Sequence, residues 1–202
     1  MLRKSLIITG ILIVLLVSSN SYAITGLGFG VRGGYVMGLD LGPVDDFLGT
    51  AVPNAEADDK MPMIGAHIKV GTLPVIDFDI ALEYAWKDMD LGNGYGLKIG
   101  DFSISATGIY KVMAGPMITP YVGVGAGSHK LSYTFDQPGG GFIIPGPDDE
   151  TKLGYHGMVG AKIHPPMFPL EFFARYRYTI ISTSDKSTKY STIFAGATFN
   201  LP

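Results

Sequence analysis

Charged side chains fall at alternate positions in two stretches of this chain. Acidic residues alternate with apolar ones in 77–83, and acids and bases do so together in 171–177. Alternate residues of an extended strand point to the same side, so each stretch gathers its charges on one face. Carboxylates that meet guanidinium or ammonium groups form ion pairs. The predicted set of facing charges is Lys69, Asp79, Glu83, Lys111, Lys162, Glu171, Arg175 and Arg177.

Residues for covalent or metal chemistry are sparse. The chain has no cysteine, which excludes thiol catalysis, cysteine metal sites and disulfides. No two histidines stand at metal-ligand spacing along a strand, so neither a metal nor a cofactor is predicted. His129 with Ser128 or Ser132 would supply two groups of a catalytic triad, but no acid stands at a defined spacing from them. We therefore expect no catalytic activity.

The first 23 residues have the pattern of a secretory signal peptide. Basic residues precede an apolar stretch at 6–17, and Ser21 and Ala23 suit a signal peptidase. A membrane anchor would need ~20 apolar residues, more than this stretch provides. We predict cleavage after Ala23, which leaves 24–202 as the mature barrel domain. Loss of Arg3 and Lys4 moves the net charge from −3 to −5, which disfavours nucleic acid as a partner.

The mature part combines sparse charge with many glycines. Charged residues make up 16% of the 202 residues, where soluble domains have about a quarter, and glycine numbers 28. After residue 23 no apolar run is long enough for a membrane-spanning helix. This composition indicates apolar surface spread over many short strands.

Period-two alternation predicts eight strands. Links after the second, fourth and sixth strands are short and contain proline, whereas the others are polar or glycine-rich and mostly longer. Alternating short and long links are typical of antiparallel strands whose ends face two compartments. Strands of about ten residues match the length needed to cross hydrocarbon. The predicted strands cover about 29–39, 62–71, 77–87, 101–113, 121–135, 152–164, 170–181 and 189–199.

The fifth strand has an ambiguous pattern. The glycines of 123–127 share parity with Leu131, whereas the other parity is apolar at Val122 and Val124 and polar after them. A bulge near Gly127 would reconcile the two halves. We predict that the odd-numbered side chains face outward.

Eight such strands could form a soluble sandwich, a lipocalin-like barrel or a membrane barrel. Tyr and Trp on the apolar parity suit a membrane interface, where one edge of the ring is apolar and the other is wet. The opposite parity is charged or small, which suits a narrow lumen. We predict an all-β, eight-stranded antiparallel up-and-down transmembrane β-barrel. Its lipid-facing aromatic belt comprises Tyr84, Trp86, Tyr110, Tyr155, Tyr176 and Tyr178.

The remaining polar groups take definite places in such a barrel. We expect His67 and His156 to face the lumen, His129 to lie at the membrane interface and His164 to be solvated in a turn. Acidic loops at 45–46, 58–59 and 148–150 would lie on the outer surface. We expect these loops to be solvated; the alternative is a divalent-cation bridge to lipopolysaccharide phosphates.

Three segments of the chain resemble small eight-stranded outer-membrane barrels of Gram-negative bacteria. The segments are GFGVRGGYVMG, PYVGVGAG and the closing STIFAGATFNLP. The OmpW-like and OmpA/OmpX-like barrel domains are the nearest groups. The closing strand resembles the family's signal for the barrel assembly machinery, although three residues follow Phe199 where the family ends on the aromatic. The OmpW-like resemblance implies an apolar passage with a lateral exit, lined here by Val122, Val124, Met158 and Phe173.

These features predict an integral outer-membrane protein with a structural or envelope-interaction role and a narrow charged lumen. We favour a lumen plugged by ion pairs over a thin water path. One alternative is an OmpW-like passive channel for small hydrophobic molecules, and a remote one is a lipid A hydrolase. Expected partners are outer-membrane lipid, lipopolysaccharide and the assembly machinery, with a small apolar ligand in the channel alternative. The sequence predicts neither conduction, nor a specific ligand, nor an oligomeric state.

Overall fold

The computed structural model describes residues 26–40, 60–73, 75–92, 95–113, 115, 117–136, 150–165, 168–182 and 187–201. Among these residues, no helix is both long and apolar enough to cross a membrane. The described strands are β1 Leu27–Asp40, β2 Met61–Leu73, β3 Ile76–Gly92, β4 Tyr95–Lys111, β5 Ile118–Asp136, β6 Glu150–Ile163, β7 Leu170–Ile181 and β8 Thr188–Asn200.

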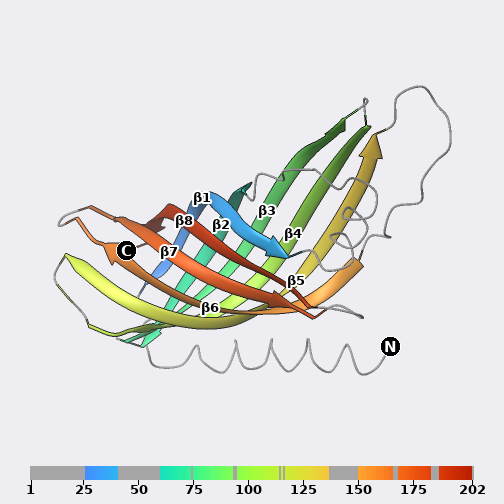
Figure 1. Ribbon diagram of the computed structural model, residues 1–202. Helices are drawn as coiled ribbons and strands as arrows, with labels where there is room; N and C mark the ends of the chain where they lie inside the picture. Colours follow the sequence, from blue (N-terminus) through green and yellow to red (C-terminus); the bar gives the residue numbers. More distant parts are fainter. Residues whose placement is uncertain are drawn as a thin grey trace.

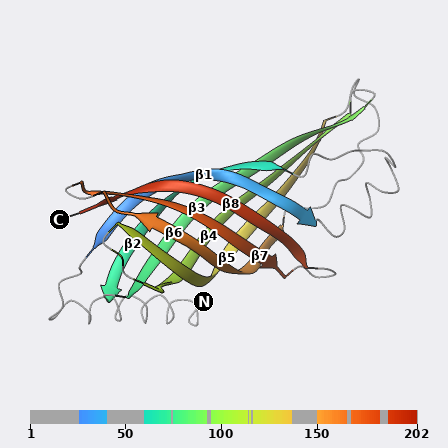
Figure 2. The same cartoon turned by 60° about the vertical axis from the view of Figure 1, so that its left-hand side comes forward.

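The eight strands form one closed antiparallel barrel (Figures 1 and 2). Each strand pairs with the next along the chain, and β1 pairs with β8 to close the ring. The predicted strand number and up-and-down topology are confirmed. Gly28 lies opposite Asn200, so β1 begins where β8 ends. We call this end, which also carries the short β2–β3, β4–β5 and β6–β7 links, the turn end, and the opposite end the loop end.

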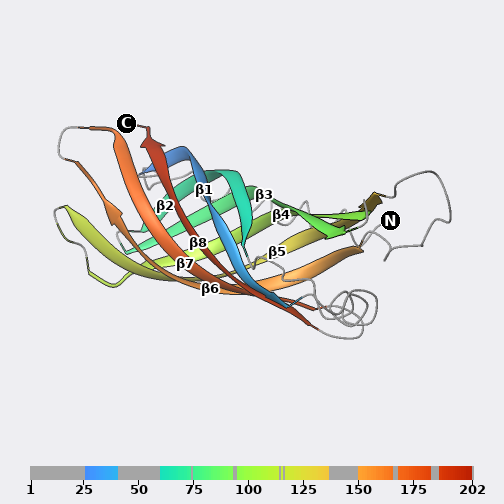
Figure 3. The same ribbon diagram turned by 45° about the horizontal axis from the view of Figure 1, so that its top comes forward.

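Three neighbouring strands extend past the others at the loop end. β3, β4 and β5 have 17, 17 and 19 residues, and they project beyond the rest of the barrel in Figures 1 and 3. Pairing of β2 with β3 reaches only Met63 opposite Ala85, whereas β3 and β4 remain paired up to Gly92 and Tyr95. The link between the predicted strands 77–87 and 101–113 is therefore shorter than expected, because 88–92 and 95–100 are strand. Apolar alternation stops at Asp88 although backbone pairing continues, which explains the error.

Apolar side chains point outward and charged ones inward. In β7 the burial pattern alternates without a break, with Phe172 and Tyr176 exposed while Arg175 and Arg177 are buried. A soluble protein would have the reverse arrangement, because exposed apolar surface of this extent is unfavourable in water. The outer surface is therefore suited to a lipid solvent.

Strand β5 contradicts the predicted orientation. The even-numbered Val122 and Val124 are 42% and 73% exposed on the outer surface, while the odd-numbered His129 and Leu131 are 2% and 4% exposed inside. Both ladders of β5 run through Gly127 without a register shift, so the predicted bulge is absent. The prediction of inward-facing valines at 122 and 124 is likewise wrong.

Inward glycines explain the orientation of β5. A Cβ atom on Gly125 would come within 2.5 Å of the His156 ring, and one on Gly123 within 2.9 Å of the Met158 side chain. The narrow lumen of an eight-stranded barrel leaves no room for side chains at these positions. The glycines therefore accommodate large inward side chains of β6 and do not mark a lipid-facing surface.

Candidate functional site

Five charged side chains meet at mid-height in the lumen. Asp79 of β3 accepts hydrogen bonds from Arg32 of β1 at 2.6 Å and from Arg175 of β7 at 2.8 Å. Glu83, on the same face further along β3, binds Arg177 through two bonds of 2.7 and 3.0 Å and Arg32 at 3.1 Å. Each carboxylate thus joins two guanidinium groups that come from different strands. We call these five residues the central cluster.

Aromatic rings enclose the central cluster. The Arg175 guanidinium lies 4.2 Å from the centre of the Phe173 ring, and its Nε donates to the Tyr121 hydroxyl at 2.6 Å. Arg32 and Arg177 lie 5.4 and 5.2 Å from the centre of the Phe194 ring. Planar guanidinium groups stack on rings and bind carboxylates in the same plane, which makes arginine suited to a dry, crowded site. Together these residues reach across the lumen from β1, β3, β5, β7 and β8.

A second group of charges lies below the central cluster, near the turn end. Asp77 accepts from Lys162 at 2.6 Å and pairs with Lys111 at 2.9 Å. Glu171 pairs with Lys69 at 2.9 Å and with Lys162 at 3.5 Å. Lys162 therefore links the two carboxylates. We call this group, completed by His164, the turn-end cluster: Lys69, Asp77, Lys111, Lys162, His164 and Glu171.

His164 follows β6 in the turn and lies at the mouth of the turn-end cluster. Its Nε2 is 2.7 Å from a Glu171 carboxylate oxygen, and its side chain is 43% exposed. Partial burial lowers the pKa of His164 below its usual 6.5, and the nearby lysines lower this pKa further although Glu171 opposes them. At neutral pH the imidazole is uncharged and donates to the carboxylate. The position in the turn predicts a solvated side chain, but the half-exposed ring also contacts Glu171.

A third polar group lies near the loop end. His129 Nδ1 is 3.1 Å from a carboxylate oxygen of Asp101, and the Tyr190 hydroxyl donates to the same oxygen at 3.0 Å. All three residues are buried inside the barrel. The expectation that His129 lies at the membrane interface is therefore wrong. Odd-numbered residues of β5 face the lumen in the structure, so the His129 side chain points inward.

The serine and histidine pair considered for a hydrolase does not assemble. Ser128 points outward while its neighbour His129 points inward, as alternation requires. Ser132 lies on the outer face, where its hydroxyl donates to the Gly100 carbonyl at 3.4 Å. The acid that sequence reasoning could not place is Asp101, but it holds His129 on the lumen side, away from both serines.

Apolar side chains fill the lumen beside the central cluster and toward the loop end. Phe173 and Phe194 contact the arginines, and Met158 packs with Ile109 and Tyr121 on the β4–β6 side. Phe173 and Met158 thus point inward as expected. The larger apolar group consists of Val36, Met61, Met63, Ala85, Phe173, Ile181, Tyr190 and Phe194.

The structure brings the predicted charges together in these clusters. Each of the eight residues named from the sequence forms an ion pair, and all lie inside the barrel. His67 and His156 also point inward, bonded to Thr198 and Thr107 at 2.9 Å. Sequence reasoning left Arg32 out of the set, because it is a single charge in a glycine-rich strand. The sequence feature that could have identified Arg32 is its place next to the apolar Val31, because neighbouring residues of a strand point to opposite faces.

The six aromatic residues of the predicted belt all point outward. Trp86, Tyr155 and Tyr178 lie in the part of their strands toward the loop end, Tyr84 lies in the middle of β3, and Tyr110 lies near the turn end. The Tyr176 hydroxyl is 2.8 Å from the Ser191 hydroxyl, which satisfies its polar atom on the outer surface. Among the described residues, no group of three or more acidic or histidine side chains is arranged to hold a metal ion.

A sequence model of the family described as outer membrane protein beta-barrel domain matches residues 9–200. The chain belongs to this family. Its barrel therefore crosses the bacterial outer membrane, with the apolar outer face against lipid and the ion-paired clusters inside. A search of curated protein sequences gives no match.

Solved structures of small outer-membrane barrels have the same fold. Neisserial surface protein A aligns with a TM-score of 0.56 at 17% identity, over 89% of this chain and 99% of that protein. Ail of Yersinia pestis, in complex with the heparin analogue sucrose octasulfate, gives 0.52 at 13% identity, over 87% and 97%. A major outer membrane protein from Thermus thermophilus gives 0.50 at 14% identity, over 87% and 99%. At these identities the similarity concerns the fold.

Proposed function

We propose that this protein is a closed outer-membrane barrel that acts through its membrane-embedded and outer surfaces, in a structural or envelope-interaction role. The observation that carries the proposal is the central cluster, where Asp79 and Glu83 bind arginines across the lumen. A solute that passed through would have to break these pairs. Breaking a buried ion pair costs ~3–5 kcal/mol, because it leaves a charge without its partner.

The balance of charge supports the same role. Six cationic side chains face five carboxylates in the three polar groups of the lumen. A pore selective for ions would show an excess of one sign along its wall. Near-complete compensation, with rings packed on the arginines, is what a plug requires, and an eight-stranded barrel is just wide enough for its side chains to fill it.

The OmpW-like passage is the second candidate. Apolar residues toward the loop end, such as Met61 and Ile181, would suit an apolar entrance. Two of its four expected lining residues, Val122 and Val124, instead face lipid. The central cluster would also have to open for a molecule to continue toward the turn end. These observations favour the structural role.

We further propose that the protein has no catalytic activity. The geometry around His129 supports this, because Ser128 and Ser132 lie on the opposite face of β5. Lipid A mass spectrometry after overexpression provides the test. We expect no loss of acyl chains, and deacylated lipid A that depends on His129 would contradict the proposal.

Export and assembly complete the proposed role. We propose cleavage of the signal peptide after Ala23, so that N-terminal sequencing of the mature protein should begin at Ile24. The 1–23 segment lies outside the described residues. The outward row of β8 would be read by the assembly machinery, and its members are Ile193, Ala195, Ala197 and Phe199.

Deletion of the gene separates the structural role from the passage. An apolar fluorescent probe enters cells faster when the outer membrane is weakened, and more slowly when its channel is lost. We expect deletion to raise probe uptake and the wild-type gene to restore the barrier. A fall in uptake would support the OmpW-like passage and contradict the proposed role.

A further inference from the structure

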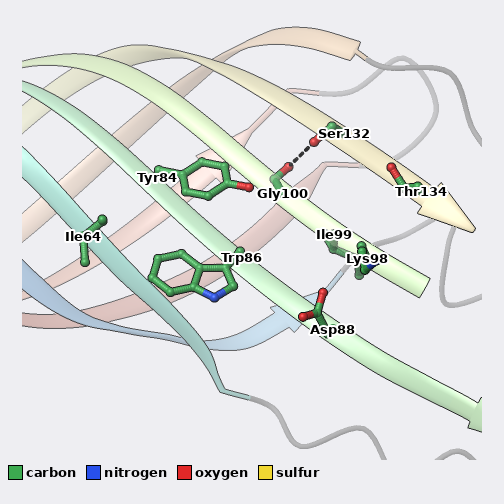
Figure 4. A pocket seen from close by; sticks show the side chains of 9 residues that line it. All are labelled: Ile64, Tyr84, Trp86, Asp88, Lys98, Ile99, Gly100, Ser132 and Thr134. Atoms are coloured by element: carbon green, nitrogen blue, oxygen red, sulfur yellow. Dashed lines mark hydrogen bonds between the residues drawn. The ribbon is translucent and has the colours of Figure 1, made fainter. Parts of the chain in front are cut away.

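An open groove of about 460 Å³ lies on the outer face of the barrel where the three long strands begin to project. Figure 4 shows residues that line it, with the Tyr84 and Trp86 rings on one side of Gly100 and Ser132 on the other. The two rings are stacked, with centres 5.7 Å apart and planes inclined by 16°. They form a flat apolar wall along β3.

The groove exists because its floor lacks a side chain. Gly100 lies directly opposite Trp86 on β3 and opposite Ser132 on β5. A Cβ atom at this position would come within 2.7 Å of the Ser132 hydroxyl and 3.4 Å of the Tyr84 hydroxyl. Gly100 is itself buried, so the absence of its side chain lets the Ser132 and Tyr84 hydroxyls approach the backbone at the floor of the groove.

Polarity changes along the groove. The cross-strand row below Gly100 contains Tyr84 and Phe102, and the row above it contains Asp88, Lys98 and Thr134. Exposed residues further toward the turn end, such as Ile104, are apolar. The groove thus lies where the lipid-facing surface gives way to the polar outer surface. An occupant must be apolar at its lower end and carry polar groups at its upper end.

We propose that this groove binds the phosphorylated amino-sugar headgroup of lipopolysaccharide, a proposal that rests on the outer-membrane placement and envelope role proposed above. A sugar ring can lie on the aromatic wall over Gly100 while its acyl chains continue down the apolar face. Lys98 supplies a cation for phosphate, Asp88 can accept hydrogen bonds from sugar hydroxyls, and the Ser132 hydroxyl can accept one while it donates to the Gly100 carbonyl. Asp88 would repel any phosphate, and sugar hydroxyls that donate to Asp88 would offset this repulsion, which favours a phosphosugar over a phospholipid whose headgroup lacks such donors.

Trp86 provides a direct probe, because it is the single tryptophan of the sequence. The full-length mature protein is placed in phosphatidylcholine nanodiscs, and lipid A is added at rising mole fraction while Trp86 emission is recorded. We expect a saturable change with lipid A. Removal of the lipid A phosphates should weaken the apparent affinity about fivefold, the effect of losing one exposed ion pair.

Two pairs of variants give matched controls. Gly100→Leu fills the groove and should abolish the saturable change, while Gly157→Leu, on an exposed site of β6 where a Cβ meets nothing within 4 Å, should leave it intact. Lys98→Gln should weaken binding about as much as dephosphorylation does. Lys189→Gln, an exposed lysine on β8, should not.

Several outcomes would overturn the proposal. They are an equal response to phosphatidylglycerol, an equal response to dephosphorylated lipid A, and a saturable response that survives in Gly100→Leu. The comparison of lipids on the wild-type protein does not depend on any variant folding. Failure of this binding test would not contradict the proposal of a closed lumen, because lumen closure is tested separately by conductance and cellular uptake.

Discussion

Each carboxylate of the central cluster binds two arginines, and this arrangement determines what a single substitution costs. Glu83→Gln removes the charge that Arg32 and Arg177 share but keeps the shape of the side chain. We expect the free energy of unfolding to fall by ~3–5 kcal/mol, because two buried guanidinium groups lose a partner. Urea unfolding in lipid vesicles measures this loss.

The control for Glu83→Gln is an acidic residue on the outer surface. Asp88→Asn, at an exposed site of β3, should change the free energy of unfolding by less than ~0.5 kcal/mol. Equal effects of the two substitutions would mean that the central cluster contributes no specific stability.

His164 gives the turn-end cluster a dependence on pH. Its pKa in the folded protein lies below the unfolded value of 6.5, so the unfolded chain binds more protons between these two pKa values. The stabilisation is therefore complete above pH ~6.5 and is lost as pH falls through the folded pKa. We expect wild type to lose stability faster than His164→Gln between pH 7.5 and 5. Parallel urea midpoints for the two proteins over this range would contradict the assignment.

Alternation predicted individual residues only where the pattern repeats. Lys69, Asp79 and Arg175 lie in strands where apolar and polar residues alternate regularly. This alternation alone was enough to predict that their side chains face the lumen. Their partners were not predictable, because the pairs join strands far apart in sequence and depend on barrel closure. Arg32 was not predicted because its strand shows no regular alternation of charged and apolar residues. The position of His129 was predicted wrongly because the orientation predicted for β5 was wrong.

At the scale of elements, the seam between β1 and β8 depends on glycine. A Cβ atom on Gly30 would come within 2.1 Å of the Ala197 carbonyl oxygen and 2.5 Å of the His67 ring. Gly30→Val should destabilise the barrel by ~1–3 kcal/mol or more through overpacking. Gly157→Val serves as the control and should be tolerated, since nothing lies within 4 Å of its Cβ position. Similar urea midpoints for both variants would contradict the close packing of the seam.

The orientation of β5 can be tested with one charge. Val124 is exposed near the middle of the strand, so Val124→Arg places a guanidinium in hydrocarbon at a cost of ~2–4 kcal/mol. Val112→Arg, just past β4 at the turn end, lies near the interface and should cost ~0–1 kcal/mol. Unfolding in vesicles compares the two. A Val124→Arg cost no larger than that of Val112→Arg would mean that position 124 does not face the bilayer centre.

Strand number, order and most boundaries were predictable because turns and alternation are local signals. The loop-end extensions of β3 and β4 were missed, although β5 was predicted as far as 135, because 88–92 and 95–100 project beyond the apolar band, where outward side chains are polar and alternation disappears. The orientation of β5 was missed for another reason. Glycine carries no side chain that indicates a face, so 123–127 fits either orientation until the bulk of His156 and Met158 is known.

At the scale of the whole molecule, the clusters and the groove give the barrel two distinct surfaces. Among the described residues, ion pairs, rings and apolar side chains lie in the lumen near the turn end, at mid-height and toward the loop end. The outer face carries an apolar band with aromatic residues and, at its upper border, the groove around Gly100. In the role that we propose, the outside of the barrel interacts with the envelope and the inside supports the barrel mechanically.

Single-channel recording in planar bilayers tests the closed lumen most directly. The account predicts that the purified mature protein gives no opening above the bilayer background at moderate voltage, because the central cluster spans the lumen. Reproducible conductance steps from the wild-type protein, which change in size when Glu83 or Arg177 is replaced, would show an open path past the cluster and contradict the account.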